Sequence, residues 1–166
     1  MRVVLYLLWL MLLTLLQPTL MPQLAVWGIA PNLFLCFVVV IGYYRGVLEG
    51  GICGMVFGLV YDLLIGRMIG VNAMLYLYLG VGAGLLGSRF FGGGKKLAIT
   101  LSAGAGTLLT AIVYYLARKA VYGDISFVTA VFRIGFLEAV YHMLAAFLLS
   151  FAVAKSMKWL RVKQIS

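Results

Sequence analysis

The stretch RGVLEGGICGMVFGLVYD, residues 45–62, decides the fold, because it repeats glycine every four residues between charged ends. The repeating glycines are Gly46, Gly50, Gly54 and Gly58. Residues four apart lie on one stripe of a helix, and a stripe of glycines lets two helix backbones approach closely. Close approach matters most in lipid, where no hydrophobic drive brings helices together. The stretch therefore predicts a membrane helix packed within the protein, with a homodimer seam as the alternative.

Composition places the chain in a membrane. Of its 166 residues, 65% are hydrophobic and only 10% are charged, whereas soluble domains carry roughly 25% charged residues. No charged residue lies between Arg2 and Arg45, and further charge-free runs cover 68–88 and 97–117. Each later run is close to the ~20 apolar residues that a spanning helix needs. We therefore predict an all-α integral membrane protein.

We predict a single transmembrane domain over residues 1–166, built as one bundle of six helices. Their approximate ranges are 3–21, 32–44, 48–65, 71–88, 97–117 and 127–154. The first resembles a signal sequence, but no A-x-A-type cleavage site follows before Trp27, so we expect it to be retained. The second would rise only about 20 Å as a helix, which is short of a bilayer core of about 30 Å. We expect it to extend past Arg45 or to dip shallowly into the membrane.

Basic residues give the orientation. With both termini in the cytoplasm, nine lysines and arginines lie on the inner side and three on the outer side, as the preference for basic cytoplasmic loops requires. The net charge of +9 is thus a topology signal, and no nucleic-acid partner is expected. The tail from Lys155 to Lys163 is also expected to contact anionic lipid at the cytoplasmic face. Cys36 and Cys53 lie in apolar segments, so we expect no disulfide, metal or cofactor site.

Small residues in two later segments complement the glycine row. They recur four apart at Gly80, Gly84 and Ser88, and again at Ser102, Gly106 and Thr110. Two facing rows of small residues allow the backbones of two helices to meet. We therefore place the third helix at the centre of the bundle, with the fourth and fifth helices packed on its glycines.

The charges of the opening stretch have separate roles. Arg45 and Glu49 are four residues apart near the inner surface, which favours a structural ion pair. Asp62 continues the glycine row and so faces protein, where a carboxylate needs a partner or has a functional role. Arg67 and Asn72 are the candidate partners, and Asn72 is equally placed to cap the fourth helix. Structural pairing of Asp62 is the favoured interpretation, with binding of a partner or ligand as the alternative.

The last segment carries a second polar cluster. Glu138 and His142 lie one turn apart near the middle of the predicted span, whereas Arg133 lies near the outer interface. We favour a hydrogen-bonded pair that fixes the sixth helix against the bundle, and a proton-handling pair is the alternative. Two ligands are too few for a metal site. These two residues, with the polar residues of the opening stretch and Asn72, are the candidates for contact with a partner or a pocket.

Residues 31–74 carry a pattern of proline, asparagine, glycine and acid. Pro31–Asn32 opens a helix, Arg45 is basic, and Gly66 and Gly70 follow the run Gly54-x3-Gly58-x3-Asp62-Leu63-Leu64. With the short loops and six helices, this pattern resembles the MreD family of rod shape-determining membrane proteins. The resemblance implies a non-enzymatic subunit of the cell-elongation machinery in the bacterial cytoplasmic membrane. It implies MreC as partner and, through MreC, the SEDS polymerase with its class B penicillin-binding protein and the actin-like MreB.

The fold of that family is similar to the substrate-binding subunits of energy-coupling-factor vitamin transporters, which are six-helix bundles with an outer pocket. A small-molecule-binding transporter subunit is therefore the main alternative to a scaffold. Asp62, Asn72, Glu138 and His142 would supply the polar groups of its pocket. An intramembrane enzyme is the least favoured class, because these residues form no recognisable nucleophile–base or paired-acid set.

Overall fold

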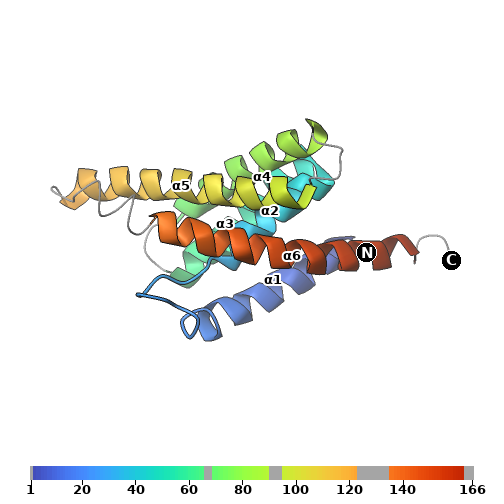
Figure 1. The fold of residues 1–166 in the computed structure, drawn as a ribbon, viewed down its shortest axis with the longest axis horizontal. Helices are drawn as coiled ribbons and strands as arrows, with labels where there is room; N and C mark the ends of the chain where they lie inside the picture. The colour runs from blue at the N-terminus through green and yellow to red at the C-terminus, as the bar shows by residue number, and fades with distance from the viewer. Residues whose placement is uncertain (1, 66–68, 90–94, 123–134, 163–166) are drawn as a thin grey trace.

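The computed structural model of the chain describes residues 2–65, 69–89, 95–122 and 135–162. Within these ranges six helices follow one another, and Figure 1 shows them as a bundle in which α1 begins and α6 ends at the same end. The helices are α1 (Arg2–Thr19), α2 (Leu33–Arg45), α3 (Val47–Ile65), α4 (Val71–Arg89), α5 (Lys95–Tyr122) and α6 (Phe136–Val162). The predicted all-α fold with six helices is confirmed.

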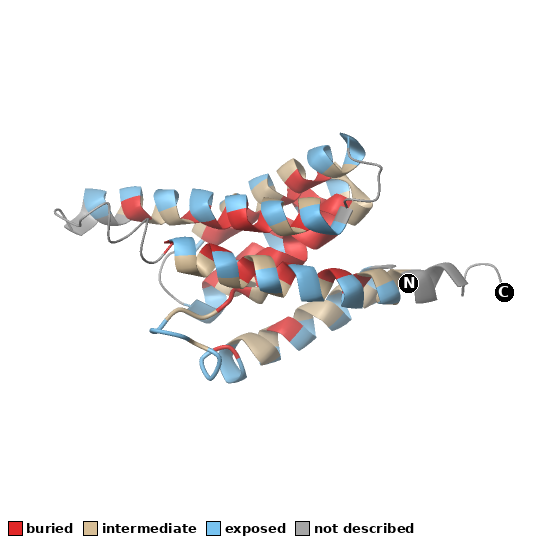
Figure 2. Cartoon of the chain, viewed as in Figure 1, coloured by how far each residue is buried: buried red, intermediate tan, exposed pale blue. Residues whose placement is uncertain are grey.

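Four helices are long and apolar enough to cross a membrane. They are α3, α4, the part of α5 from Lys96 to Ala117, and the part of α6 from Phe136 to Met157. The helices α1 and α2 are apolar but shorter. Figure 2 shows exposed residues along the outer sides of the helices, and many of these are large and hydrophobic. Such a surface requires lipid around it, so the chain is a multi-pass membrane protein.

Two helices differ from their predicted ranges by more than two residues. The helix α5 extends beyond the predicted 97–117 at both ends. The helix α6 runs on to Val162, past the predicted end at residue 154. The predicted first turns of the sixth helix, 127–134, lie outside the described residues. Both helices therefore continue beyond their apolar spans, which are Lys96–Ala117 and Phe136–Met157.

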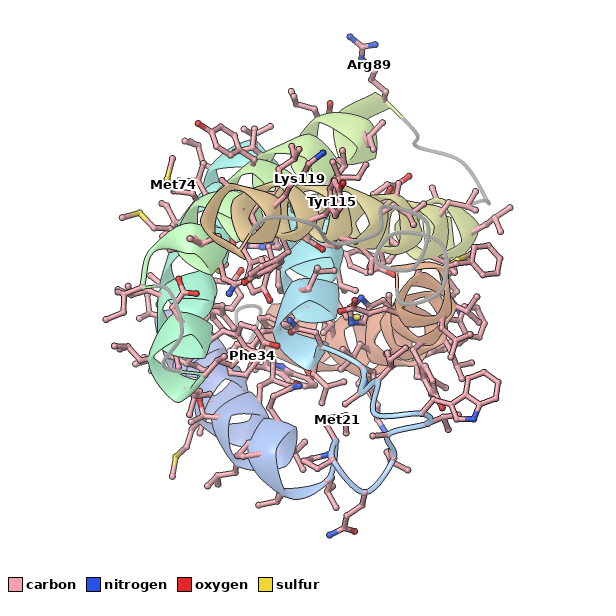
Figure 3. The ribbon with its side chains drawn as sticks, turned by 90° about the vertical axis from the view of Figure 1, so that its left-hand side faces the viewer. Met21, Phe34, Met74, Arg89, Tyr115 and Lys119 are labelled. Carbon is pink, nitrogen blue, oxygen red and sulfur yellow. The ribbon has the colours of Figure 1, made fainter. Side chains whose placement is uncertain are left out.

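The centre of the bundle is α2. Every residue from Phe34 to Tyr43 is buried, and α2 contacts each of the other five helices. Figure 3 shows Phe34 near the middle of the end-on view, whereas Met74 lies at the rim. A helix that is apolar on all sides has to be covered on all sides, and here the covering is protein. The prediction that the third helix is central was wrong, because α3 packs mainly on α2 and α4 and exposes the rest of its surface.

The predicted extension of the second helix past Arg45 was also wrong. Gly46 follows with φ +92, and α3 begins at the next residue, Val47. This φ lies in the left-handed region, which glycine adopts without strain. A Cβ added at Gly46 would meet no described atom within 4 Å. Gly46 was predicted to be a packing glycine, and its lack of a side chain instead serves the turn between α2 and α3.

The glycine row of α3 packs directly on the backbone of α4. A Cβ added at Gly54 would lie 2.1 Å from the carbonyl oxygen of Tyr76. One added at Gly58 would lie 2.5 Å from the carbonyl oxygen of Asn72. Both distances are far inside van der Waals contact, so only glycine fits at these two positions. The row is buried within one chain, between α3 and α4.

The glycines of α4 complete this seam. Gly50 and Gly80 face each other, since an added Cβ on either would lie 2.1–2.5 Å from the other's carbonyl oxygen. A Cβ at Gly84 would lie 2.5 Å from the backbone nitrogen of Val47, at the start of α3. The two helices thus approach along their whole shared length, from the turn at Gly46 to the end of α3.

The fifth helix does not pack on the glycine row, contrary to the prediction. Its main contacts are with α6, α2 and α4. Gly106 faces Leu79 of α4, and the hydroxyl of Thr110 donates to the carbonyl oxygen of Thr107 within α5 itself. Ser88 of α4 is exposed. Small residues four apart therefore predicted the α3–α4 contact correctly but assigned the wrong neighbour to α5.

Candidate functional site

Polar side chains gather at the two ends of α2. One group lies at its C-terminal end, around Arg45. The other lies at its N-terminal end, around Asn32. A third polar group, separate from these two, surrounds the carboxylate of Asp62 at the start of α4. Because α2 is central, each group joins several helices, and these groups are the candidate site of the molecule.

The group at the C-terminal end of α2 is an ion pair with a third member. The Nε of Arg45 donates to Oε2 of Glu49 at 2.9 Å, and its Nη2 donates to Oε1 at 3.0 Å. The hydroxyl of Tyr6 in α1 also donates to Glu49. A two-point pair between guanidinium and carboxylate is stronger and more directional than a single contact. The expected Arg45–Glu49 pair is present, and it joins α1, α2 and α3.

Asp62 accepts four hydrogen bonds at the start of α4. Its Oδ1 accepts from the backbone N–H and the side-chain amide of Asn72, at 3.2 and 2.7 Å. Its Oδ2 accepts from the backbone N–H groups of Gly70 and Ala73, at 2.8 and 3.2 Å. The side chain is 2% exposed. Asp62 therefore caps α4 from the end of α3, where a negative charge also complements the helix dipole.

The sequence predicted one of these partners. Asn72 is bonded to Asp62 as expected, whereas Arg67, the other candidate, lies outside the described residues. Asn72 is not the cap of α4, because it lies inside that helix and the capping oxygens belong to Asp62. The three backbone donors were not predicted, since they depend on the path of the turn between α3 and α4.

Asn32 links three helices at the N-terminal end of α2. Its Oδ1 accepts from the backbone N–H of Leu35 at 3.2 Å and so caps α2. Its side-chain amide donates to the hydroxyl of Tyr76 in α4. Its backbone N–H donates to Nε2 of His142 in α6, at 2.6 Å. Gln17 of α1 adds a fourth link, because it bonds the backbones of Pro31 and Leu33 at 3.1 and 2.9 Å.

The hydrogen bonds fix the protonation of His142. A backbone N–H can only donate, so the Nε2 that accepts from Asn32 carries no proton. The neutral ring then carries its proton on Nδ1, which lies 2.6 Å from Oγ1 of Thr107. The hydroxyl of Thr107 is free to accept, because its own proton goes to the carbonyl oxygen of Ala103 at 2.8 Å. His142 therefore joins α6 to α2 and α5 as a neutral, fully bonded ring.

The predicted hydrogen bond between Glu138 and His142 was wrong. Both ring nitrogens of His142 are bonded to other residues, Asn32 and Thr107. Glu138 lies half-buried in the first turn of α6, and the described residues give it no hydrogen bond. Its charge at a helix N-terminus is favourable by itself. Arg133, the third member of the predicted cluster, lies outside the described residues.

Four residues of the hydrogen-bond network around Asn32 and His142 were missing from the predicted site: Gln17, Asn32, Tyr76 and Thr107. Asn32 had a signal, because an asparagine after proline at the start of an apolar run is typical of an N-cap. Gln17 had a weaker one, as an amide within a charge-free helix. Tyr76 and Thr107 had none, since tyrosine and threonine are common in membrane helices and their partners lie far away in the sequence.

The network holds helices together. Among the described residues, every buried side-chain nitrogen and oxygen has a hydrogen-bond partner. The same residues contain no group of three histidine, cysteine or acidic side chains that could hold a metal ion. The polar atoms inside the bundle are thus bonded to one another, and these hydrogen bonds connect the helices.

A family model matches nearly the whole chain. Residues 1–162 match the model described as rod shape-determining protein MreD. No curated protein and no solved structure matched the chain. The similarity to energy-coupling-factor subunits therefore stays a prediction. Because the family model covers nearly the whole of a six-helix membrane protein, the chain belongs to the MreD family and has a role in determining rod shape.

Proposed function

We propose that this protein is a non-enzymatic scaffold of the cell-elongation machinery, which binds MreC in the membrane and thereby supports peptidoglycan synthesis. MreB and the SEDS polymerase with its class B penicillin-binding protein are contacted indirectly, through MreC. Anionic lipid contacts the basic residues at the end of the bundle where α1 begins and α6 ends. The family supplies the biological setting, and the placement of polar and apolar side chains supports the scaffold role.

The observation that carries the proposal is that buried polar atoms are bonded inside the bundle while large apolar side chains face outward. Asp62, Asn72 and His142, for which contact with a ligand or partner was the alternative interpretation, are bonded to other parts of the chain. What remains for a partner is the apolar outer surface. Helices in lipid recognise one another through packing along such surfaces.

The outward row of α3 is the surface that we assign to MreC. It consists of exposed side chains spaced as one helical stripe: Leu48, Ile52, Met55, Leu59 and Leu63. The opposite side of the same helix is fixed to α4 by the glycine seam. A partner helix lying along this row would contact a rigid surface, because α3 cannot shift without opening that seam.

The test is recovery of MreC with paired variants. Ile52→Trp with Leu63→Trp alters the α3 row, and Leu144→Trp with Leu148→Trp makes the same change on exposed leucines of α6. We expect the α3 pair to reduce co-purification of MreC in mild detergent and to round the cells, while the α6 pair leaves both unchanged. Equal recovery with both pairs would remove the α3 assignment. Rod-shaped cells after depletion, with no MreC recovered from the unaltered protein, would remove the scaffold proposal.

The vitamin-binding alternative needs polar side chains that are free to contact a ligand. Three of its four polar groups are engaged in caps and helix links, which leaves Glu138. Thermal-shift screening with vitamins and cell-wall precursors tests it directly. Stabilisation by one of these compounds, abolished by Glu138→Gln, would favour a binding subunit over the scaffold.

A further inference from the structure

The connection between α1 and α2 contains a two-residue hairpin with tryptophan at its tip. Val26 and Ile29 exchange two backbone hydrogen bonds, of 3.1 and 3.0 Å. The residues between them are Trp27, with φ 54, and Gly28, with φ 78. Two consecutive left-handed residues are typical of a tight primed turn, where asparagine or glycine is usual. A bulky aromatic residue in this conformation is uncommon and strained.

Trp27 is also the most exposed large apolar side chain of the described residues, at 85%. Its neighbours Leu20, Leu24 and Val26 are exposed as well. The connection carries no charged residue, since none lies between Arg2 and Arg45. A loop in water would not gather its apolar side chains at an exposed tip. This surface continues the outward face of α1, which lipid covers.

The base of the hairpin is fixed to the bundle. Gln17 bonds Pro31 and Leu33 on the far side of the loop. Met21 is buried, and Figure 3 shows it within the curve of the connection. Figure 1 places the connection at the end of the bundle where α6 begins, opposite to the start of α1. The tip is therefore held in one direction, at one end of the bundle.

We propose that the hairpin from Val26 to Ile29 is an interfacial anchor, with the Trp27 indole inserted at the boundary between lipid headgroups and acyl chains. An indole suits this boundary because its ring is apolar while its N–H bonds to headgroup or carbonyl oxygens. The occupant of the exposed surface is lipid, since the tip continues the lipid-covered face of α1 and carries no charge to recognise a polar partner. The anchor sets the depth of α1 and, through Asn32, of the short α2.

Tryptophan fluorescence tests the depth of insertion. The chain has three tryptophans, so Trp9→Phe with Trp159→Phe leaves Trp27 as the single emitter. In vesicles of phosphatidylethanolamine and phosphatidylglycerol we expect blue-shifted emission and little quenching by iodide. Lipids brominated close to the headgroup should quench more strongly than lipids brominated near the chain terminus. Unshifted emission with full quenching by iodide would overturn the proposal.

Labelling of a neighbouring position separates the anchor from the turn. Trp27→Gly suits the left-handed backbone but removes the indole, whereas Trp27→Tyr keeps an amphipathic ring. In a Leu24→Cys background, with the native cysteines buried, we expect Trp27→Gly to raise labelling by an impermeant maleimide several-fold. Trp27→Tyr should leave the labelling near its original level. Equal labelling of all three, or shielding of Trp27 only when MreC is reconstituted with the protein, would overturn the lipid assignment.

Discussion

Asp62 is surrounded by backbone and amide donors, and the described residues place no basic side chain on it. The usual partner of a carboxylate in lipid is an opposite charge. Here the start of α4 replaces it, because three backbone N–H groups converge on the two oxygens. The first N–H groups of a helix lack internal partners and carry partial positive charge. An acid in the membrane is thus explained by a helix that begins beside it.

Replacing Asp62 separates its charge from its hydrogen bonds. Asp62→Ala leaves buried donors of α4 without acceptors, and we expect it to lower the free energy of unfolding by about 2 kcal/mol. Asp62→Asn keeps one acceptor oxygen, so its loss should be smaller. Thermal unfolding in detergent measures both, with Leu63→Ala on the exposed neighbour as control. A destabilisation by Leu63→Ala equal to that by Asp62→Ala would contradict the capping role.

His142 shows why the nearest polar residue is a poor guide to a buried partner. Glu138 is four residues away on the same helix, yet the ring bonds Asn32 and Thr107, which come from other helices. An i, i+4 pair on a helix contributes only a few tenths of a kcal/mol. Without His142, the buried backbone N–H of Asn32 would have no acceptor, and that loss costs more free energy than an i, i+4 pair contributes. Local spacing therefore could not predict the partner.

The hydrogen bonds of His142 predict its tautomer. The chain contains one histidine, so ¹⁵N-histidine labelling gives signals from this ring alone. We expect a neutral ring with its proton on Nδ1, because Nε2 accepts from the Asn32 backbone. Thr107→Val should shift the Nδ1 signal, since it removes the acceptor oxygen. A proton on Nε2 in the unaltered protein would contradict the network.

For the helices, the sequence predicted the packing of glycines better than the position of each helix in the bundle. Close approach of α3 to another helix follows from a local rule, since four-residue spacing places the glycines on one side. The central place of α2 does not follow from any local rule. The thickness of the bilayer sets the length of a helix that faces lipid. The helix α2 faces other helices instead, and these determine how long it has to be. Asn32 and Arg45 at its ends bond other helices, so the ends need not reach the membrane surfaces.

The same substitution, glycine to alanine, tests the seam at one position inside it and at one position outside it. Gly54→Ala places a methyl group against the Tyr76 carbonyl, so we expect a loss of about 3 kcal/mol or failure to fold. Gly82→Ala, on α4, meets no described atom within 4 Å and should stabilise the helix slightly. Detergent unfolding and the yield of monodisperse protein measure both. Similar stability of the two variants would contradict the α3–α4 contact.

In the whole molecule, large apolar side chains fill the described interior and also cover the outer surface, and a few polar groups lie between the helices. The described interior contains Asp62, His142 and Asn32 with their partners, and the outer surface contains leucine, isoleucine and phenylalanine. In lipid, hydrogen bonds between helices supply specificity that apolar contacts do not. The polar groups thus determine how the six helices fit together, and the apolar surface is left for lipid and partner helices.

This arrangement argues against a homodimer formed by the glycine row. That row is occupied by α4 within the same chain, so a second copy could reach it only by displacing α4. The outward row of α3 is the surface that we assign to MreC, so we do not expect it to bind a second copy. We therefore expect a monomer by native mass spectrometry in mild detergent without MreC, and no disulfide-linked dimer from Ile52→Cys under oxidation. A dimer that persists on dilution and cross-links through Ile52→Cys would show that the outward face of α3 is self-associating, and would displace MreC from it.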